Sequence, residues 1–222
     1  VTQSLPALGV FPTDDPLALG FHGHTGNQTA GLALQHADCV LVCGSRLDVR
    51  QTGSLPDRFA PGATIARIEL DAAELDHARV RADLTLRADA GLALAALHAA
   101  LAGRAQADRS AWLARIRGWQ AEYPLAWREA GALAPQRVIA SANRLTRAET
   151  RPVIAVSGVG AHQQWAARHF DFDWPRRTWL SSCGHGAMGY DLPVAAGAQL
   201  AVPEARVLCF VGDGSLQMNL QE

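Results

Sequence analysis

Short apolar runs alternate along the chain with longer segments in which apolar and small residues recur at helical spacing. The runs are rich in Val, Ile and Leu, which is typical of buried strands. Strands that alternate with helices form parallel sheets, so the pattern predicts an α/β protein. Strands are predicted at residues 37–43, 64–70, 152–156 and 206–211, and helices at 28–36, at 90–102, from 135 onward and at 187–201.

The predicted elements form two groups, separated by a stretch of different character. Residues 104–134 carry Trp112, Trp119 and Trp127 at roughly helical spacing, which favours a packed helix over an aromatic binding platform. We expect both groups to be incomplete, because a doubly wound sheet normally continues past its last predicted strand here, and an open edge invites aggregation. The prediction is two Rossmann-like, doubly wound parallel-sheet units at 1–103 and 135–222, joined by a helical linker at 104–134.

Composition excludes some partners. Hydrophobic residues make up 49% of the 222 residues and charged residues 18%, as in folded α/β domains. A net charge of −1 without a basic cluster argues against nucleic acid, and no apolar run is long enough to span a bilayer. We therefore expect no nucleic-acid or membrane partner and a cytoplasmic location.

The cysteines are expected to be buried structural thiols. Cys39, Cys43 and Cys209 lie within or at the end of apolar runs, and Cys183 is the fourth. A zinc site on the first two would need further ligands at zinc-site spacing, and the sequence offers none nearby.

One motif carries the clearest chemistry. The apolar run 206–211 is followed by Gly212-Asp213-Gly214-Ser215. Open α/β sheets bind ligands at the carboxyl ends of their strands, and a carboxylate there suits Mg²⁺, which takes one or two carboxylates together with substrate phosphates. Glycines would let the backbone approach a diphosphate closely. The competing interpretation is an ordinary Asp-Gly turn between two strands.

Three segments resemble the thiamine-diphosphate enzymes, especially the acetolactate synthase group. They are Phe210 to Asn219, Gly184 to Pro193 (Gly-His-Gly-Ala-Met-Gly-Tyr-Asp-Leu-Pro) and Val159 to Ala167 (Val-Gly-Ala-His-Gln-Gln-Trp-Ala-Ala). Their order and approximate spacing also agree with that family. The resemblance implies thiamine diphosphate and Mg²⁺ as cofactors, with Asp213 as the metal ligand. The residues implied to bind the cofactor are Gly160, His162, Gly186, Ala187, Met188, Gly212, Asp213, Gly214 and Ser215.

Met188 has a specific implied role. It matches the bulky apolar residue that holds the cofactor in its bent form, although a methionine there could also be a plain helix-core residue. The chain departs from the family at Ala161, where Gln is common, and around Cys183 and His185. These departures fall close to the substrate side, so they affect the expected substrate more than the cofactor.

Residues 1–103 resemble the middle domain of the same family, which binds FAD in acetolactate synthases. Arginines and a glycine would meet the phosphates, and acids would meet the ribose and adenosine. The alternative is an empty or ADP-filled site, in which the arginines pair with Asp48 and Asp57. Thr25 also replaces the usual His of the FAD-binding members, and a metal pair at His22 and His24 is disfavoured because no third ligand is apparent. The implied FAD or nucleotide residues are Gly44, Arg46, Arg50, Glu69 and Asp89.

The resemblance implies a function for the whole protein. It would be a thiamine-diphosphate-dependent transferase that decarboxylates a 2-oxo acid such as pyruvate and joins the remainder to a second carbonyl compound, giving 2-acetolactate. The alternatives are a related 2-oxo acid decarboxylase and a non-catalytic nucleotide-binding module. The activating Glu is expected upstream of Val1 and an Asn pair beyond Glu222, so the segment alone is expected to be inactive. A homodimer or homotetramer is expected, because the family holds its cofactor between two chains.

Overall fold

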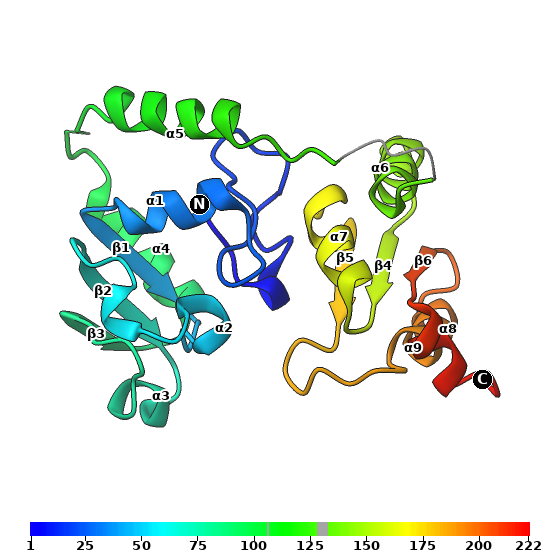
Figure 1. Ribbon diagram of the computed structural model, residues 1–222. Coiled ribbons are helices and arrows are strands. Elements are labelled where there is room, and N and C mark those ends of the chain that lie inside the picture. Colours follow the sequence, from blue (N-terminus) through cyan, green and yellow to red (C-terminus); the bar gives the residue numbers. More distant parts are fainter. Residues whose placement is uncertain (106, 128–132) are drawn as a thin grey trace. The chain divides into compact units, whose positions relative to one another are not determined.

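The computed structural model describes residues 1–105, 107–127 and 133–222. The chain forms two compact units (Figure 1). One unit comprises Gln28–Pro124, and the other combines Val1–Asn27 with Leu125–Glu222. Domains defined by family resemblance need not coincide with such units, so the limits 1–103, 104–134 and 135–222 stay a prediction.

The unit Gln28–Pro124 contains a parallel sheet of order β1-β2-β3. Cys39 is in register with Thr64, and Ala66 with Leu84. Its core comprises Val42, Leu47, Phe59 and Ile65 with their neighbours. The strands are β1 (Cys39–Cys43), β2 (Thr64–Glu69) and β3 (Leu84–Arg87), and the helices are α1 (Gln28–Gln35), α2 (Val49–Thr52), η2 (Pro56–Arg58), α3 (Ala72–Asp76), α4 (Ala90–Leu101) and α5 (Ser110–Glu122).

Helix α5 packs through its tryptophans, as its spacing predicts. Trp119 stacks on His36 with ring centroids 5.3 Å apart, and Trp112 meets Trp119 edge-on at 5.8 Å. The prediction of buried thiols is wrong for Cys39, which is exposed, and Cys43, Cys183 and Cys209 are only partly buried. The exposed residues of β1, Cys39 and Leu41, lie on the same face of the strand, so that face is open to solvent at these positions.

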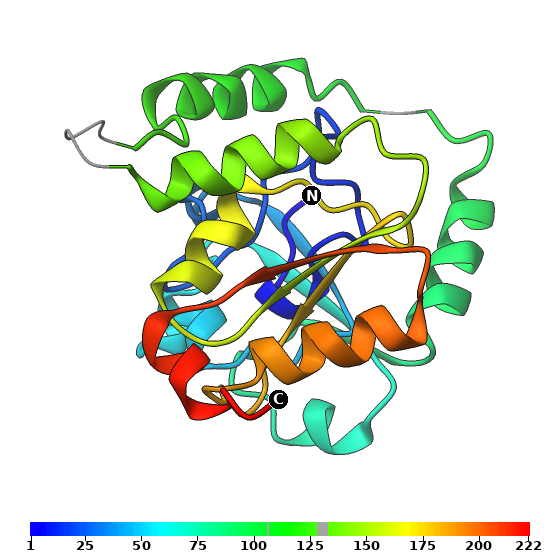
Figure 2. The ribbon, with the colours of Figure 1, turned by 90° about the vertical axis from the view of Figure 1, so that its right-hand side faces the viewer.

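The other unit contains a parallel sheet of order β5-β4-β6. The central strand β4 is buried along its whole length. Helices α6 and α7 pack on one face, in a core with Ala155, Phe170 and Trp179, and α8 covers the other face through Ala195 (Figure 2). The strands are β4 (Val153–Ser157), β5 (Arg177–Ser181) and β6 (Arg206–Phe210), and the helices are η1 (Leu5–Ala7), α6 (Pro135–Thr146), α7 (Ala161–His169), α8 (Asp191–Ala201) and α9 (Asp213–Met218).

Helix α8 begins later than the sequence pattern predicts. The expected helix starts at residue 187, whereas α8 starts at Asp191. Gly189 has a φ of 77°, which is outside the right-handed helical region, so the helix cannot extend back through it. Residues 182–190 form a loop instead.

The two parallel sheets with their covering helices confirm the predicted α/β class. In the described ranges, no helix is both long and apolar enough to cross a membrane. Within the second unit, strands β4, β5 and β6 run in the same direction, so the loops at their carboxyl ends emerge at the same edge.

Candidate functional site

A cavity of about 800 Å³ lies at this edge, at the carboxyl ends of β4 and β6. One part of its wall is apolar and includes Val138, Ile139, Trp165 and Phe210. The other part is formed by the loops that carry the predicted cofactor residues. Of these, Gly160, His162, Met188, Gly212, Asp213, Gly214 and Ser215 line the cavity. Gly186 and Ala187 belong to the same loop as Met188 but are outside the lining.

The first of these loops comes after β4 and positions His162. The imidazole lies so close to two glycines that a Cβ at either position would require the ring to shift. A Cβ at Gly160 would lie 2.7 Å from His162 Cε1, and a Cβ at Gly212 would lie 3.0 Å from the same atom. Gly160 also has a φ of 155°. Both glycines are therefore needed for the close approach of the ring.

The loop after β5 is held by local hydrogen bonds. The Ser182 hydroxyl accepts from the backbone N–H of Ala187 at 3.0 Å, and the Ser182 carbonyl accepts from Gly186 N–H at 3.1 Å. Met188 is next in the loop and is 53% exposed. It is thus not a helix-core methionine, which was the competing interpretation.

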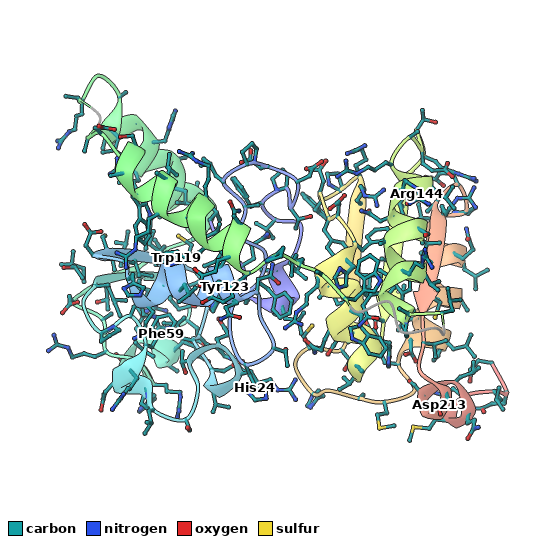
Figure 3. All side chains as sticks on the ribbon, turned by 45° about the horizontal axis from the view of Figure 1, so that its top comes forward. His24, Phe59, Trp119, Tyr123, Arg144 and Asp213 are labelled. Atoms are coloured by element: carbon teal, nitrogen blue, oxygen red, sulfur yellow. The ribbon has the colours of Figure 1, made fainter. Side chains whose placement is uncertain are left out.

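Asp213 opens helix α9 directly after β6 and is exposed (Figure 3). The Asp213 Oδ1 atom accepts from Gly214 N–H at 2.8 Å. The motif leads into a helix and β6 is parallel to β4, so the turn between two adjacent strands is the wrong interpretation.

A magnesium ion fits this donor set. Among the residues with defined positions, no group of three His, Cys, Asp or Glu side chains could hold a metal on its own. Mg²⁺ needs only one or two carboxylates when a phosphate ligand completes its shell. The single exposed carboxylate of Asp213 beside the glycine-lined wall is therefore a suitable arrangement for a diphosphate-bound Mg²⁺.

Asp191 is a functional candidate that has no role in the sequence analysis. Its side chain is 0% exposed, and it lies at the first position of α8. Its Oδ2 accepts from Gly158 N–H at 3.0 Å and lies 3.2 Å from His162 Nε2, and its Oδ1 accepts from the Ser215 hydroxyl at 2.5 Å. The only local signal is an acid just before Leu192-Pro193 at a helix start, which does not distinguish it from an ordinary helix-terminal Asp.

Cys209 also lines the cavity. Burial raises the pKa of its thiol to about 11, and the charge of Asp191 adds to this shift. The thiolate is the reactive form of cysteine, so Cys209 is unsuited to act as a nucleophile near neutral pH.

In the unit Gln28–Pro124, the predicted nucleotide residues lie at or near the ends of its three strands. Gly44, with a φ of 60°, comes directly after β1 and donates its N–H to Ile68 O at 2.9 Å. Glu69 ends β2, and its Oε1 accepts from Leu70 N–H at 2.8 Å. Asp89 comes after β3 and caps α4 by accepting from Leu92 N–H at 2.9 Å.

The two arginines near β1 are exposed. The Arg46 guanidinium lies 3.6 Å from Asp48, which is one of the two ion pairs that the empty-site alternative anticipated. Arg50 lies on α2, whose first turn is capped by Asp48. The roles of these residues and of Gly44, Glu69 and Asp89 toward FAD stay predictions.

The chain belongs to the thiamine pyrophosphate enzymes. Residues 1–97 match the family described as "Thiamine pyrophosphate enzyme, central domain", and residues 158–222 match "Thiamine pyrophosphate enzyme, C-terminal TPP binding domain". Within this class, the chain is similar to acetolactate synthases. It is 40% identical over 228 residues to "Probable acetolactate synthase 2, chloroplastic" of Oryza sativa subsp. japonica, an alignment that covers all of this chain and 34% of the relative.

The chain is also similar to bacterial acetolactate synthases. The chain is 40% identical to the "Acetolactate synthase large subunit" of Parasynechococcus marenigrum and 36% identical to that of Haemophilus influenzae. All of the chain is aligned in both cases, with 35% and 38% of the relative. The chain thus spans about a third of the length of these relatives. The predicted family is confirmed.

Proposed function

We propose that this chain is part of a thiamine-diphosphate-dependent carboligase that converts two molecules of pyruvate into 2-acetolactate and carbon dioxide. The observation that supports this most directly is that three separate family motifs meet at one cavity through His162, Met188 and Asp213. The names of the relatives supply the reaction.

Thiamine diphosphate would supply the electron sink that allows a 2-oxo acid to lose its carboxylate. In this proposal, Asp213 ligates Mg²⁺, and the backbone of Gly214 and Ser215 lies near the diphosphate. Gly160 and His162 face the diphosphate from the segment after β4. Gly212 comes directly before the metal ligand Asp213. The loop after β5 supplies Gly186, Ala187 and Met188.

The remaining wall has a different task. The apolar side chains of Val138, Ile139, Trp165 and Phe210 line one side of the cavity, and we propose that they help to exclude water from it. Fixed charges and hydrogen bonds act more strongly when water is excluded. Met188 is exposed and close to α9, and we propose that it supports the bent conformation of the cofactor.

We also propose that FAD binds the other unit at Gly44, Arg46, Arg50, Glu69 and Asp89. The support is that Gly44, Glu69 and Asp89 lie at or near the ends of three adjacent parallel strands, where dinucleotides bind open sheets. An absorbance spectrum of the purified protein tests this point. Bound flavin gives a yellow protein, whereas thiamine diphosphate without flavin favours the related decarboxylases.

We further propose a homodimer or homotetramer in the cytoplasm. The family holds its cofactor between two chains, which supports self-association. The free thiols of Cys39, Cys43 and Cys209 suit a reducing compartment, although six plant relatives are named as chloroplastic.

The reaction is tested by incubating the complete gene product with pyruvate, Mg²⁺ and thiamine diphosphate. One acetolactate per carbon dioxide released supports the proposal. Carbon dioxide with acetaldehyde supports the decarboxylase alternative. Neither product with any of several 2-oxo acids, together with tight nucleotide binding, favours the non-catalytic module. The 222-residue segment by itself is expected to be inactive, and acetolactate formed by it would overturn that expectation.

A further inference from the structure

Asp191 is a fully buried acid beside the candidate cofactor cavity, and the preceding proposal gives it no role. A buried carboxylate is costly unless hydrogen bonds compensate for its lost hydration. Asp191 has such compensation from residues that belong to other loops than its own. This arrangement is a reason to ask which parts of the site those bonds hold in place.

The hydrogen bonds of Asp191 and Ser215 together join all three loops of the site. The Asp191 Oδ2 atom accepts from Gly158 N–H, in the loop after β4, at 3.0 Å and lies 3.2 Å from Nε2 of His162, in the first turn of α7. The Ser215 hydroxyl meets its Oδ1 from α9 at 2.5 Å. Gly189 N–H in turn donates to the Ser215 hydroxyl at 2.8 Å. One carboxylate thereby connects the loop after β4, the start of α9 and, through Ser215, the loop between β5 and α8.

The contact with His162 also orients its ring. An ionised carboxylate only accepts hydrogen bonds, so opposite ionised Asp191 the contact has His162 Nε2 as the donor. Gly160 and Gly212 confine the ring, because a Cβ at either position would come within 3.0 Å of it. Gly160 and Gly212 thus set the position of the ring, and Asp191 sets which ring nitrogen carries the proton. The ring therefore presents one edge to the cavity in a single orientation.

We propose that Asp191 is a positioning residue for the diphosphate end of thiamine diphosphate. It acts through His162 and Ser215, which line the cavity, while Asp191 itself does not. The inference rests on the proposed function, since it concerns the same cofactor site. It makes Asp191 comparable to the outer partners that orient metal-binding histidines.

The variants separate orientation from folding. Asp191→Ala removes all three bonds. Asp191→Asn keeps an acceptor for Gly158 and His162 and offers its amide to Ser215, so it is the conservative replacement and the variant that retains the fold if Asp191→Ala does not. Asp171→Asn is the matched control, because Asp171 accepts hydrogen bonds from Asn143 and Arg147 in the same unit, away from the cavity lining.

The first readout needs no cofactor. Nitrogen-15 NMR of the histidine rings reports which ring nitrogen carries the proton, and a His162→Gln variant assigns the His162 signal. We expect the Nε2–H form in the wild type and in Asp171→Asn. In Asp191→Ala we expect a mixture of both forms. An unchanged His162 signal in Asp191→Ala overturns the proposal.

The second readout is the affinity of the complete gene product for Mg²⁺–thiamine diphosphate by calorimetry. Loss of an outer positioning partner typically weakens binding by about 10- to 100-fold, and we expect a loss of that size in Asp191→Ala. Asp191→Asn should recover most of the affinity, and Asp171→Asn should bind as the wild type does. A fall that merely tracks the loss of folded protein, equal in Asp171→Asn, overturns the positioning role. If the wild type does not bind the cofactor while the His162 signal still depends on Asp191, the proposed function fails instead.

Discussion

The methyl carbon of Met188 lies 3.8 Å from the position that a Cβ on Gly214 would occupy. Met188 comes from the loop before α8 and Gly214 from the first turn of α9, so two motifs far apart in the sequence meet here. A Cβ at 214 would be in ordinary van der Waals contact with this methyl group, so the two residues are direct neighbours. The side chain of Met188 remains 53% exposed, which is unusual for a methionine whose role is packing.

Replacing Met188 with Ala is expected to separate activity from stability. Because the side chain is half exposed, the free energy of unfolding should change by less than about 0.5 kcal/mol, as for ordinary surface positions. Misplacement of a reacting group by 1 Å costs on the order of 100-fold, so turnover by the complete gene product should fall by roughly 10- to 100-fold. Urea unfolding and acetolactate assays measure the two effects.

Met218→Ala is the matched control, because Met218 is 54% exposed and does not line the cavity. Equal turnover in the two variants would contradict a special role for Met188.

Asp213→Asn is expected to weaken Mg²⁺-dependent cofactor binding. The amide keeps an oxygen but loses the charge that attracts the cation. A loss of roughly tenfold or more, which is about 1.4 kcal/mol or more, should appear when Mg²⁺ is titrated at fixed thiamine diphosphate. The fold should be retained, since Asp213 is exposed.

Asp76→Asn changes an equally exposed acid at the end of α3 and should leave the titration unaltered. If both variants require the same Mg²⁺ concentration as the wild type, Asp213 is not the metal ligand.

Much of this site could be predicted from the sequence because its signals are local. The apolar run before Gly212 specifies β6, and the glycines with Asp213 identify the motif at the carboxyl end of that strand. Asp191 could not be found in this way, because its importance arises only when three strand ends meet. Strand β3 could not be predicted from the sequence either, because its residues Leu84–Arg87 are all exposed and form no apolar run.

The loop and strand limits show a second cause of error. A run of small residues predicts a helix from 187, but the positive φ of Gly189 delays α8 to Asp191. Similarly, the apolar run around Cys39 predicts burial, although Cys39 and Leu41 lie on a face of β1 that is exposed at these positions. Both errors concern backbone conformation or the covering of a strand face, which hydrophobic spacing does not encode.

Gly160→Ala is expected to disturb the position of His162. The new Cβ would lie 2.7 Å from the ring, at a backbone φ of 155° that side chains rarely adopt. Strained backbone of this kind costs about 1–3 kcal/mol, so the variant should unfold at lower urea concentration. Gly184→Ala serves as the control, since a Cβ there would meet no atom within 4 Å. Equal stability of the two variants would show that the ring moves aside freely.

Cys209 is expected to resist alkylation, whereas Cys39 reacts first. Burial raises the pKa of the Cys209 thiol to about 11, so only roughly one molecule in a thousand carries the thiolate at pH 8. Cys39 is exposed and accessible to reagent. Mass spectrometry after timed treatment with iodoacetamide gives the order of modification, with urea-unfolded protein as the reference for full reactivity. Early labelling of Cys209 in the folded protein would contradict its environment.

Glu149 is expected to contribute stability that disappears in acid. It accepts hydrogen bonds from Arg151 at 2.9 Å and from Arg206 at 2.6 Å, which lower the pKa of its carboxyl below the ordinary 4.5. The folded state therefore favours the charged form. This contribution is complete above the unfolded-state pKa and is lost as the pH falls through the lower folded-state pKa.

Glu149→Gln removes this contribution, since the amide cannot ionise. Urea unfolding at pH 7 should show a less stable variant, and the difference from the wild type should shrink as the pH is lowered below about 4.5. Glu204→Gln, at an exposed position shortly before β6 in the sequence, should track the wild type at every pH. A Glu149→Gln deficit that stays constant down to the acid limit would mean that packing around β6, rather than the charge of Glu149, accounts for its effect.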